Sequence, residues 1–480
     1  MSNYQLVVVG AGPGGYAAAF AAADLGMNVA IIDPEEKLGG VCLLRGCIPS
    51  KALLHVAKLV GEAKHSAAWG VAFEAPKVDV DKLRAFKDSV VGKMTGGLAQ
   101  LAKQRKVTHI RGMASFVDAK TLSVELVAGP STGSGQGGKE EVTFDHCIIA
   151  TGSRPAQIPG FPTDSPRVMD STGGLDLPDV PKTLLVVGGG YIGLELGTVY
   201  AALGTKVTVV EMTSGLLPGA DRDLVTFLSR RLETTMHKIF VNTKVTEMKD
   251  TGSGVFVKME GEGLADADKN QTFDRVLVAV GRRPNSAVPG LDKTKVKVEK
   301  GFINVDHTLR TDEPSIYAIG DVVGEPMLAH KASHEARVAV EAIAGHKVAF
   351  EPQAIPGVVF TDPEVAWAGL TEAEAQKQGR KVEIAKFPWA ALGRAVAIDR
   401  PDGMTKLIID PATERILGVG IVGSGAGELI AEGVLAIEMA ALATDLKLSI
   451  HPHPTLSETL MEAAEVYFGQ STHVYRPKRK

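Results

Sequence analysis

Two copies of the pattern Gly-x-Gly-x-x-Gly, one beginning at Gly10 and one at Gly188, constrain the fold of this chain more than any other feature. Each copy follows an apolar run typical of a buried strand, at residues 5–9 and 184–187, and each precedes a helical segment. A second apolar strand then follows each helix. This strand–turn–helix–strand context ties the glycine pattern to dinucleotide binding. The sequence therefore predicts an α/β chain with two Rossmann-like dinucleotide-binding domains.

The first motif has the residues that a dinucleotide fingerprint needs. Gly10 makes the tight turn, Gly12 lets the backbone approach a pyrophosphate, and Gly15 packs the helix against the strand. The helix N-terminus would face the phosphates. The following strand ends at Asp33, 18 residues beyond Gly15, where a carboxylate would accept hydrogen bonds from a ribose.

The second motif repeats this design and indicates the type of dinucleotide. Its glycines are Gly188, Gly190 and Gly193, and the strand at residues 206–210 leads to Glu211, again 18 residues beyond the last glycine. A carboxylate at this position favours a free ribose 2′-hydroxyl and repels a 2′-phosphate. The next three residues supply no arginine. The second site is therefore predicted to bind NAD rather than NADP.

Two further copies of the glycine pattern, beginning at Gly133 and Gly418, lack this context. About 0.6 copies are expected by chance in a chain with 53 glycines among 480 residues. The copy at Gly133 has no strand leading into it and is predicted to be a flexible hairpin loop. The copy at Gly418 lies in the return arm of a predicted hairpin, with no β-α-β unit after it. We assign no ligand to either copy.

Cys42 and Cys47 form the other informative pattern, a Cys-x4-Cys pair between the two fingerprints. In an undistorted helix their Cα atoms would be roughly 8–9 Å apart, whereas a disulfide needs less than about 7 Å. Pro49 clashes with the carbonyl of Arg45, four residues back, and Gly46 adds backbone freedom. A bent turn between the sulfurs is therefore expected, and a strained, exposed disulfide there would be easy to reduce.

The spacing alone leaves other interpretations of the pair open. Two free, buried structural cysteines are the commoner fate of intracellular cysteines. A metal pair is more often Cys-x2-Cys with a second pair elsewhere, which this sequence lacks, so no metal site is predicted. The third cysteine, Cys147, lies in an apolar run and is predicted to be a buried strand residue without chemistry.

Composition narrows the class of protein. A chain of 480 residues is expected to form about two to four domains, and 45% hydrophobic with 22% charged residues is ordinary for a globular protein. The net charge of −4 argues against nucleic acid as a main partner.

Residues 1–5 show no signal-peptide pattern, and no apolar run reaches the ~20 residues of a membrane span, so a cytoplasmic protein without a membrane partner is expected. The basic residues 476–480 are interpreted as a solvated tail.

The two fingerprints with Cys-x4-Cys between them resemble the pyridine nucleotide–disulfide oxidoreductases. The resemblance covers residues 4–470 and is strongest to members that oxidise dihydrolipoamide, the E3 components of 2-oxo acid dehydrogenase complexes. It implies oxidation of protein-bound dihydrolipoamide to lipoamide with reduction of NAD⁺, through FAD and a redox-active disulfide between Cys42 and Cys47. It also implies FAD at the first fingerprint, NAD at the second, and lipoyl domains and an E2 core as partners.

The resemblance assigns cofactor contacts beyond the glycines. Lys51 would lie beside flavin N5 and pair with Glu195, and Asp321 would hold the ribityl chain of FAD. From the sequence alone, Lys51 would be a surface lysine and Asp321 a helix N-cap. The other implied contacts are Gly40, Ala114, Thr151, Gly152 and Ala329 for FAD, and Tyr191, Ile192, Glu195, Val245, Ala279 and Gly281 for NAD.

A second chemical group lies near the C-terminus, where His451 and His453 each precede a proline and Glu458 follows His453 by five residues. Proline favours an extended or turn conformation of the histidine before it, and the carboxylate can fold back and hold the ring tautomer. The sequence alone favours a His-rich surface loop. The resemblance implies that His453 is the catalytic base, that Glu458 orients it, and that His451 is a bystander.

The resemblance also gives a domain order. Residues 1–155 would bind FAD, residues 156–280 would bind NAD, residues 281–350 would complete the FAD site, and residues 351–480 would form an interface domain. That last domain would make a homodimer in which His453 reaches the cysteine pair of the other subunit. The predicted fold class is therefore α/β, with two Rossmann-like dinucleotide-binding domains plus a C-terminal α+β dimerisation domain.

Two positions depart from the usual family pattern. Asp33 stands where members commonly have glutamate, and the aspartate keeps the carboxylate. Leu44 and Arg45 stand between the cysteines where members usually have Asn-Val. We hypothesise that Arg45 lowers a thiol pKa or shifts the flavin–disulfide equilibrium.

Four alternatives stay open at this point. Glutathione-type reductases use NADPH and would need basic residues near Glu211. Mercuric reductases carry a C-terminal cysteine pair, and soluble transhydrogenases lack the pair at Cys42. A redox-inactive FAD-binding structural protein is the fourth, and the presence of both cysteines, His453 and Glu458 argues against it.

Overall fold

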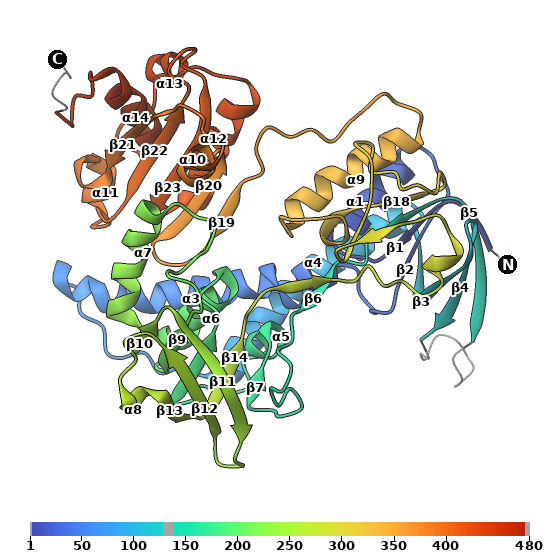
Figure 1. Ribbon diagram of the computed structural model, residues 1–480, viewed down its shortest axis with the longest axis horizontal. Coiled ribbons are helices and arrows are strands. Elements are labelled where there is room, and N and C mark those ends of the chain that lie inside the picture. The colour runs from blue at the N-terminus through green and yellow to red at the C-terminus, as the bar shows by residue number, and fades with distance from the viewer. Residues whose placement is uncertain (1, 128–137, 476–480) are drawn as a thin grey trace.

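The N-terminal α/β unit is built on a mainly parallel sheet. The computed structural model describes residues 2–127 and 138–475. The strand order is β3-β2-β1-β5-β18, and β4 pairs antiparallel with β3 and β5. The strands are β1 (Ser2–Val9), β2 (Val29–Asp33), β3 (Thr108–Asp118), β4 (Thr121–Leu126), β5 (Lys139–Ile149) and β18 (Ile316–Ala318). Helices α1 (Pro13–Asp24) and α9 (Ala329–Ile343) pack against each other on one face (Figure 1).

Alternate residues of β1 explain why this sheet is covered on both faces. Leu6 and Val8 belong to a buried cluster with α1 and α9. Val7 and Val9 belong to a second buried cluster, formed with β3, β4 and β5. A strand buried on both faces needs a continuous apolar run rather than an alternating one, and residues 6–9 supply it.

The second α/β unit has a parallel five-stranded sheet in the order β10-β9-β8-β14-β7. Its strands are β7 (Val168–Met169), β8 (Thr183–Val187), β9 (Lys206–Val210), β10 (Lys238–Phe240) and β14 (Arg275–Val278). Its helices are α5 (Ser171–Asp176), α6 (Tyr191–Ala202) and α7 (Arg222–Thr235). A separate antiparallel sheet consists of β11 (Thr243–Asp250), β12 (Val255–Gly261) and β13 (Asn270–Phe273). Strands β6 (Ser153–Pro155) and β15 (Arg282–Pro284) pair antiparallel where the chain crosses between the two units (Figure 1).

The C-terminal unit is an antiparallel sheet covered by helices. The strand order is β19-β20-β23-β22-β21. The strands are β19 (Gly357–Val359), β20 (Glu364–Gly369), β21 (Glu383–Pro388), β22 (Met404–Ile409) and β23 (Ile416–Gly423), and the helices are α10 (Glu372–Lys377), α11 (Gly393–Ala397), α12 (Ala426–Glu438), α13 (Ala443–Leu448) and α14 (Glu458–Phe468). The three units together have the α/β plus α+β architecture that the sequence predicts.

The shorter elements, which lie in different units, are η1 (Ser66–Trp69), α8 (Asp266–Lys269), η3 (Leu291–Lys293), β16 (Val298–Glu299), β17 (Phe302–Ile303), η4 (Gly320–Val322) and η5 (Trp389–Ala391).

Two consecutive helices carry the paired cysteines. Helix α2 (Gly40–Arg45) ends and α3 (Cys47–His65) begins at Gly46, whose φ of −148° and ψ of −113° are not helical. A Cβ atom at Gly46 would meet the carbonyl oxygen of Val41 at 2.8 Å. The bend that the sequence predicts between the two sulfurs is therefore present, and it is located at the glycine.

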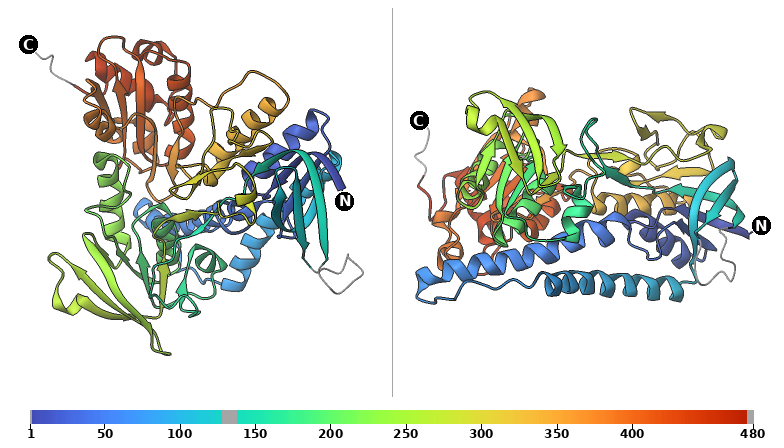
Figure 2. Two further views of the ribbon diagram at one scale, coloured as in Figure 1. Left: turned by 45° about the vertical axis from the view of Figure 1, so that its right-hand side comes forward. Right: turned by 90° about the horizontal axis from the view of Figure 1, so that it is seen from below.

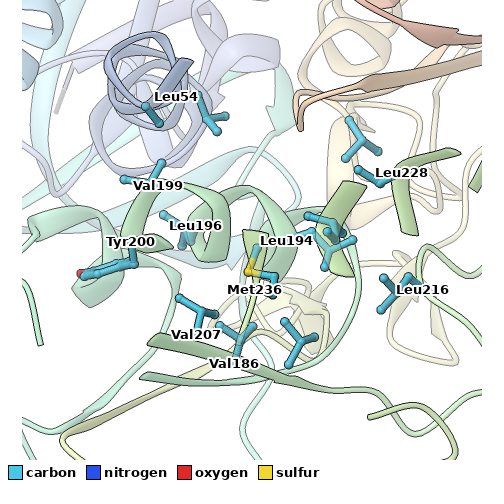
Figure 3. Close-up of a cluster of buried hydrophobic side chains, with 14 of the residues drawn as sticks. Leu54, Val186, Leu194, Leu196, Val199, Tyr200, Val207, Leu216, Leu228 and Met236 are labelled. Atoms are coloured by element: carbon cyan, nitrogen blue, oxygen red, sulfur yellow. The ribbon is translucent and has the colours of Figure 1, made fainter. Parts of the chain in front are cut away.

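Helix α3 connects the first unit to the second. Its Leu54 lies in one buried cluster with Leu196 and Val199 of α6 (Figure 3). Helix α4 (Val80–Gln104) runs beside α3 on the outside of the molecule (Figure 2). The packing of α3 on α6 fixes the cysteine helices relative to the second glycine motif.

One helical run, Gly40–Trp69, is long and apolar enough for a membrane span by length and composition alone, with a mean hydropathy of 1.2. No apolar run of the ~20 residues that a membrane span needs was expected from the sequence, and this run reaches that length with Arg45 and Lys51 inside it. The run is broken at Gly46 and packs against α4 and α6. We therefore interpret it as an internal helix pair of the fold.

A buried ion cluster joins the second unit to the C-terminal unit. Lys406 of β22 is 1% exposed, and its ammonium nitrogen lies 2.6 Å from Asp221 and 2.8 Å from both Asp223 and Glu372. Within the described part of the chain, these three carboxylates form a group whose members lie close enough together to hold a metal ion. Lys406 and Lys386, whose ammonium lies 2.7 Å from Asp223 and 3.1 Å from Glu372, both bring positive charge to these carboxylates. We therefore assign the cluster to packing between the units.

The apolar patterns predict a helix over residues 16–25, a strand over residues 386–389 and a helix over residues 428–441, and the structure differs at the boundaries of each. The first helix begins at Pro13 rather than at residue 16, because proline fits the first turn of a helix. Trp389, predicted at the end of a strand, begins the η5 turn. The helix predicted at 428–441 is α12, which ends before Ala440, a residue with a φ of +55°.

The two glycine copies without a predicted ligand fall in different places. Gly418 lies in β23, which pairs on both sides and leads to α12 without a further parallel strand. The residues at 128–137, which include Gly133, lie outside the described residues, as does the basic segment at 476–480. Strands β4 and β5, on either side of the first gap, pair antiparallel.

Candidate active site

A cavity of about 590 Å³ lies at the carboxyl ends of the parallel strands in the first unit. Residues directly after β1, β2, β5 and β18 line it, together with α2, the start of α3 and the start of α6. This edge of a parallel sheet is the usual ligand position in open α/β folds. Of the predicted FAD contacts, the cavity is lined by Gly10, Gly12, Asp33, Gly40, Lys51, Ala114, Thr151, Gly152, Asp321 and Ala329. Gly15 does not line it.

The first glycine motif leaves bare backbone at the cavity wall. Gly10 has a φ of +108°, and a Cβ atom there would lie 2.3 Å from the carbonyl oxygen of Ala150. Gly15 packs behind the turn, where a Cβ atom would lie 1.9 Å from the carbonyl oxygen of Gly10. A Cβ atom at Gly40 would lie 2.5 Å from the Cα atom of Gly12. Gly12 caps α1 without a side-chain hydrogen bond, so the helix N-terminus is free to bind a pyrophosphate.

Asp33 is held in place by backbone donors. Its Oδ2 atom accepts the N–H of Ala11 at 2.7 Å, and its Oδ1 atom accepts the N–H of Glu35 at 2.9 Å. Each carboxylate oxygen has a further lone pair available. The carboxylate is therefore oriented and can still accept a hydroxyl hydrogen from a ribose. The cavity, its free helix N-terminus and this carboxylate fit a bound FAD.

The second glycine motif has the same geometry. Gly188 has a φ of +110°, and a Cβ atom there would lie 2.3 Å from the carbonyl oxygen of Ala279. Glu211 is 8% exposed, and its carboxylate accepts the N–H groups of Gly189 and Thr213, each at 2.7 Å. Gly190 caps α6 without a side-chain bond, which leaves a second free helix N-terminus. These features fit a dinucleotide with an unphosphorylated ribose.

The remaining predicted NAD contacts lie around this motif. Val245 is in β11, Ala279 follows β14, and Gly281 has a φ of +110°. Gly193 packs against the turn, since a Cβ atom there would lie 2.2 Å from the carbonyl oxygen of Gly188. Tyr191, Ile192 and Glu195 line the first cavity. Helix α6 therefore borders both predicted cofactor sites.

Cys42 and Cys47 both line the cavity, with their sulfurs not bonded to each other. A hydrogen bond to Cys47 and burial raise the pKa of Cys42 far above its ordinary value. The hydrogen bond from Cys42 lowers the pKa of Cys47 to about 7, against an opposing effect of desolvation, and the positive charge of Lys51 acts in the same direction as the hydrogen bond. Cys47 is therefore the sulfur that carries negative charge in the reduced pair.

Lys51 is held at the cavity by Glu195. The Lys51 ammonium donates to the Glu195 Oε2 atom at 2.8 Å, and the Glu195 side chain is 4% exposed. The same oxygen accepts the Ser50 hydroxyl at 2.9 Å, and the other oxygen accepts the N–H of Phe360 at 3.0 Å. Lys51 is thus not a free surface lysine, which was the interpretation from the sequence alone.

Asp321 lies in η4, where the N-cap position belongs to Ile319, so Asp321 is not the helix N-cap that the sequence alone suggests. Its carboxylate accepts the hydroxyl of Ser153. Below the turn, the buried Glu335 accepts the N–H of Gly320 at 2.6 Å and pairs with Lys331 at 2.7 Å. This support aims Asp321 into the cavity.

His453 and Glu458 form the predicted pair. The His453 Nδ1 atom lies 2.8 Å from the Glu458 Oε1 atom, and the Glu458 Oε2 atom accepts the N–H of Thr455 at 2.8 Å. Although burial would raise it, the pKa of Glu458 is lowered by the hydrogen bonds from Thr455 and His453. The His453 side chain is 73% exposed, and neither residue is among those that line the cavity of this subunit. His451 is bonded elsewhere, to Glu432 at 2.7 Å.

Arg45 has a partner that the sequence did not suggest. Its guanidinium forms an ion pair with Glu35, just after β2, and both residues line the cavity. The charges that act on the pKa of Cys47 come from Lys51 and Glu195. The structure therefore gives no support to the hypothesis that Arg45 lowers a thiol pKa, and the alternative, a shift of the flavin–disulfide equilibrium, stays a prediction.

Four site residues escaped prediction from the sequence: Ser50, Ser153, Glu335 and Phe360. Three of them act through a partner distant in the chain: Ser50 through Glu195, Ser153 through Asp321 and Phe360 through Lys51. Glu335 acts through the nearby Gly320 and Lys331. Serine and phenylalanine carry no local pattern that marks such a contact. Ser50 directly precedes Lys51, and that neighbouring position is the one available sequence signal.

The fold and this site define the class of protein. The chain belongs to the pyridine nucleotide-disulphide oxidoreductase family, whose model matches residues 4–336, and the dimerisation domain of that family matches residues 355–464. Membership implies the use of FAD and NAD, and the dimerisation domain supports a homodimer. The fold-class prediction is confirmed.

The more particular likeness is to dihydrolipoyl dehydrogenases. The chain is 51% identical over 477 residues to the dihydrolipoyl dehydrogenase of Haemophilus influenzae, covering 99% of this chain and 97% of the relative. It is 49% identical to that of Vibrio cholerae, covering 99% and 98%. Among solved structures it resembles LpdA from Mycobacterium tuberculosis, with a TM-score of 0.86 and 25% identity over 97% of this chain and 99% of that one. It also resembles the HOCl-induced flavoprotein disulfide reductase RclA from Escherichia coli, with a TM-score of 0.82 and 27% identity over 95% and 98%.

Proposed function

We propose that the chain is a dihydrolipoyl dehydrogenase, which oxidises protein-bound dihydrolipoamide to lipoamide and reduces NAD⁺ to NADH. The observation that carries the proposal is the placement of Cys42 and Cys47 in the same cavity as the first glycine motif, with Cys47 the more acidic sulfur. The likeness to dihydrolipoyl dehydrogenases over nearly the whole chain supports this choice among disulfide oxidoreductases.

The chemistry begins with the cysteines joined as a disulfide. His453 of the partner subunit takes the proton of one substrate thiol, and the thiolate attacks the Cys42 sulfur. The Cys42–Cys47 bond breaks, and Cys47 leaves as a thiolate. The second substrate thiol then closes the lipoamide ring, Cys42 leaves as a thiol, and one proton is released to solvent. When bound at this cavity, FAD would supply the redox chemistry that carries the electron pair of the reduced cysteines to NAD⁺.

The roles of the other residues follow from their contacts. Lys51 stabilises negative charge at Cys47 and at the flavin, and Glu195 holds it there. Glu458 fixes the tautomer of His453 and stabilises the charged imidazole. FAD is held by Gly10, Gly12, Asp33, Gly40, Ala114, Thr151, Gly152, Asp321 and Ala329, and NAD by Gly188, Gly190, Tyr191, Ile192, Glu211, Val245, Ala279 and Gly281. Gly15 and Gly193 support the two turns from behind.

The proposal includes an assembly and a location. The active site is shared across the subunits of a homodimer, because the exposed His453 does not line the cavity of its own subunit. Lipoyl domains and the E2 core of a 2-oxo acid dehydrogenase complex supply the substrate. A cytoplasmic location fits a disulfide that is reduced in each cycle. The domain limits at 155, 280 and 350 stay a prediction.

A substrate panel tests the proposed function. Purified, FAD-loaded protein is assayed with dihydrolipoamide and NAD⁺, and separately with glutathione disulfide and NADPH. We expect NADH formation in the first assay at least about 10²-fold faster than turnover in the second, since the second site disfavours a 2′-phosphate. Faster turnover with glutathione disulfide and NADPH would contradict the proposal.

The Glu211 carboxylate is expected to exclude NADP⁺. Glu211→Gln keeps an acceptor oxygen and removes the charge, so kcat/KM for NADP⁺ should rise about tenfold, which corresponds to about 1.4 kcal/mol. Glu233→Gln, at an exposed position on α7, is the control and should leave both cofactors unchanged. A parent protein that already prefers NADP⁺ would overturn the assignment.

The reduced protein is expected to lose its Cys47 thiolate as the pH falls through about 7, the value to which its pKa is lowered. Above this pH the thiolate donates electron density to the flavin and gives a long-wavelength charge-transfer band. Below it the protonated sulfur cannot. A pH titration of this band in the two-electron-reduced protein measures the midpoint. Lys51→Met should raise the midpoint, and a parent midpoint near the ordinary value of 9.0 would contradict the assignment.

A further inference from the structure

Phe360, directly after β19 of the C-terminal unit, contacts the lysine of the active site. The Lys51 ammonium nitrogen lies 4.4 Å from the centroid of the Phe360 ring. A cation at this distance from an aromatic face is attracted by the negative face of the ring. Lys51 therefore has two partners, the carboxylate of Glu195 and the ring of Phe360.

The backbone of Phe360 is fixed by the same carboxylate. Its N–H donates to the Glu195 Oε1 atom at 3.0 Å, while the Glu195 Oε2 atom accepts Ser50 and Lys51. Glu195 belongs to α6 of the second unit, and Ser50 and Lys51 belong to α3. Three units of the fold therefore meet at one buried carboxylate.

Lys51 stands between two open spaces. One is the predicted FAD cavity, which Glu195 also lines. The other, of about 670 Å³, is lined by Lys51 and Phe360, by the acidic residues Asp362, Glu364 and Glu428, and by the basic residues Lys58, Lys64 and Arg231. The contacts of the flexible lysine side chain with Glu195 and Phe360 fix the ammonium at the boundary between the two spaces.

We propose that Phe360 is a positioning residue, whose ring holds the Lys51 ammonium at the flavin and so lets the C-terminal unit set the charge next to the cofactor. The proposal rests on FAD binding in the cavity, as proposed above. Without the ring, the ammonium loses one of its two partners and is less firmly held at the edge of the FAD cavity, and the reduced, negatively charged flavin loses stabilisation.

The test is the two-electron reduction potential of the flavin in protein whose cysteine pair is already reduced, measured on FAD-loaded protein with dithionite and a reference dye. Phe360→Leu should disfavour the reduced flavin about three- to tenfold, which lowers the potential by about 14–30 mV for a two-electron couple. Phe360→Met, which keeps bulk without a ring, should do the same. Phe360→Tyr keeps the aromatic face and should restore the parent value.

Two controls separate positioning from loss of packing. Phe227→Leu removes a ring that packs against the same buried cluster as Phe360, and it should leave the potential unchanged. In a Lys51→Met background, Phe360→Leu should cause no further shift, because it acts through Lys51. An unchanged potential in Phe360→Leu, or an equal shift in the Lys51→Met background, would overturn the inference. The potential is measured without a lipoyl substrate, so a failure of dihydrolipoamide oxidation would instead contradict the proposed function.

Discussion

Cys42→Ser is expected to lower dihydrolipoamide oxidation by at least about 10⁴-fold, because loss of the attacked sulfur removes one essential member of a catalytic unit. A serine hydroxyl cannot form the disulfide that the substrate thiolate must attack. FAD should stay bound, since Asp33, Asp321 and the free N-terminus of α1 are untouched. Steady-state NADH formation and the flavin absorbance of the purified variant measure the two effects.

The third cysteine provides the matched control. Cys147 is fully buried in β5, and Cys147→Ala removes a thiol that takes no part in the proposed chemistry. It should keep turnover within about twofold of the parent, with a modest loss of stability from the smaller side chain. Retained turnover in Cys42→Ser, or its loss in Cys147→Ala, would reject the role assigned to the pair.

His453→Gln is expected to slow turnover by at least about 10²-fold, the typical contribution of a general base. Glutamine keeps a hydrogen-bonding side chain but cannot take the thiol proton. His451→Gln is the neighbouring control, because His451 is bonded to Glu432 rather than to Glu458. It should have a much smaller effect, measured as kcat with saturating substrates.

Mixed dimers test where His453 acts. Neither the Cys42→Ser nor the His453→Gln homodimer should turn over. In a refolded equal mixture about half of the dimers are mixed, and each mixed dimer has one intact site if the site is shared between subunits. About a quarter of the parent activity should then return. No recovery would mean that His453 serves the cysteines of its own chain.

The geometry of the cofactor-binding loops can be predicted from the sequence, because the residues that form each loop lie close together in the chain. The turn at Gly10, the bare backbone at Gly12 and the carboxylate at Asp33 lie within one short β-α-β segment, so their spacing fixes their geometry. The bend between the cysteines is also local, since Gly46 interrupts the helix between them. These features could be predicted without knowledge of the rest of the chain.

Contacts between distant segments could not be predicted in this way. Arg45 was expected to act on its neighbouring thiols, but Glu35 lies close enough to pair with its charge. Phe360 reaches Lys51 across more than three hundred residues of sequence. Single aromatic or serine residues carry no periodic signal, so their roles depend on the packing of the three units.

The predicted role of His453 came from the family resemblance and not from residue spacing, and the structure adds the surroundings of its side chain. The sequence alone favoured a surface loop at His453, and the exposed ring with its bond to Glu458 fits both a surface loop and a base that serves another subunit. The dimerisation domain that matches residues 355–464 supports the second interpretation. The mixed-dimer experiment decides between them.

Single-turnover absorbance tests the central claim most directly. FAD-loaded protein is mixed anaerobically with one equivalent of dihydrolipoamide, and NAD⁺ is added after the first phase. If electrons pass through the cysteine pair, we expect a charge-transfer band from the Cys47 thiolate in the first phase. The band should then disappear in the second phase as NADH forms. Direct bleaching of the flavin without that band, or NADH formation by Cys42→Ser at the parent rate, would contradict the proposed electron path through the cysteine pair.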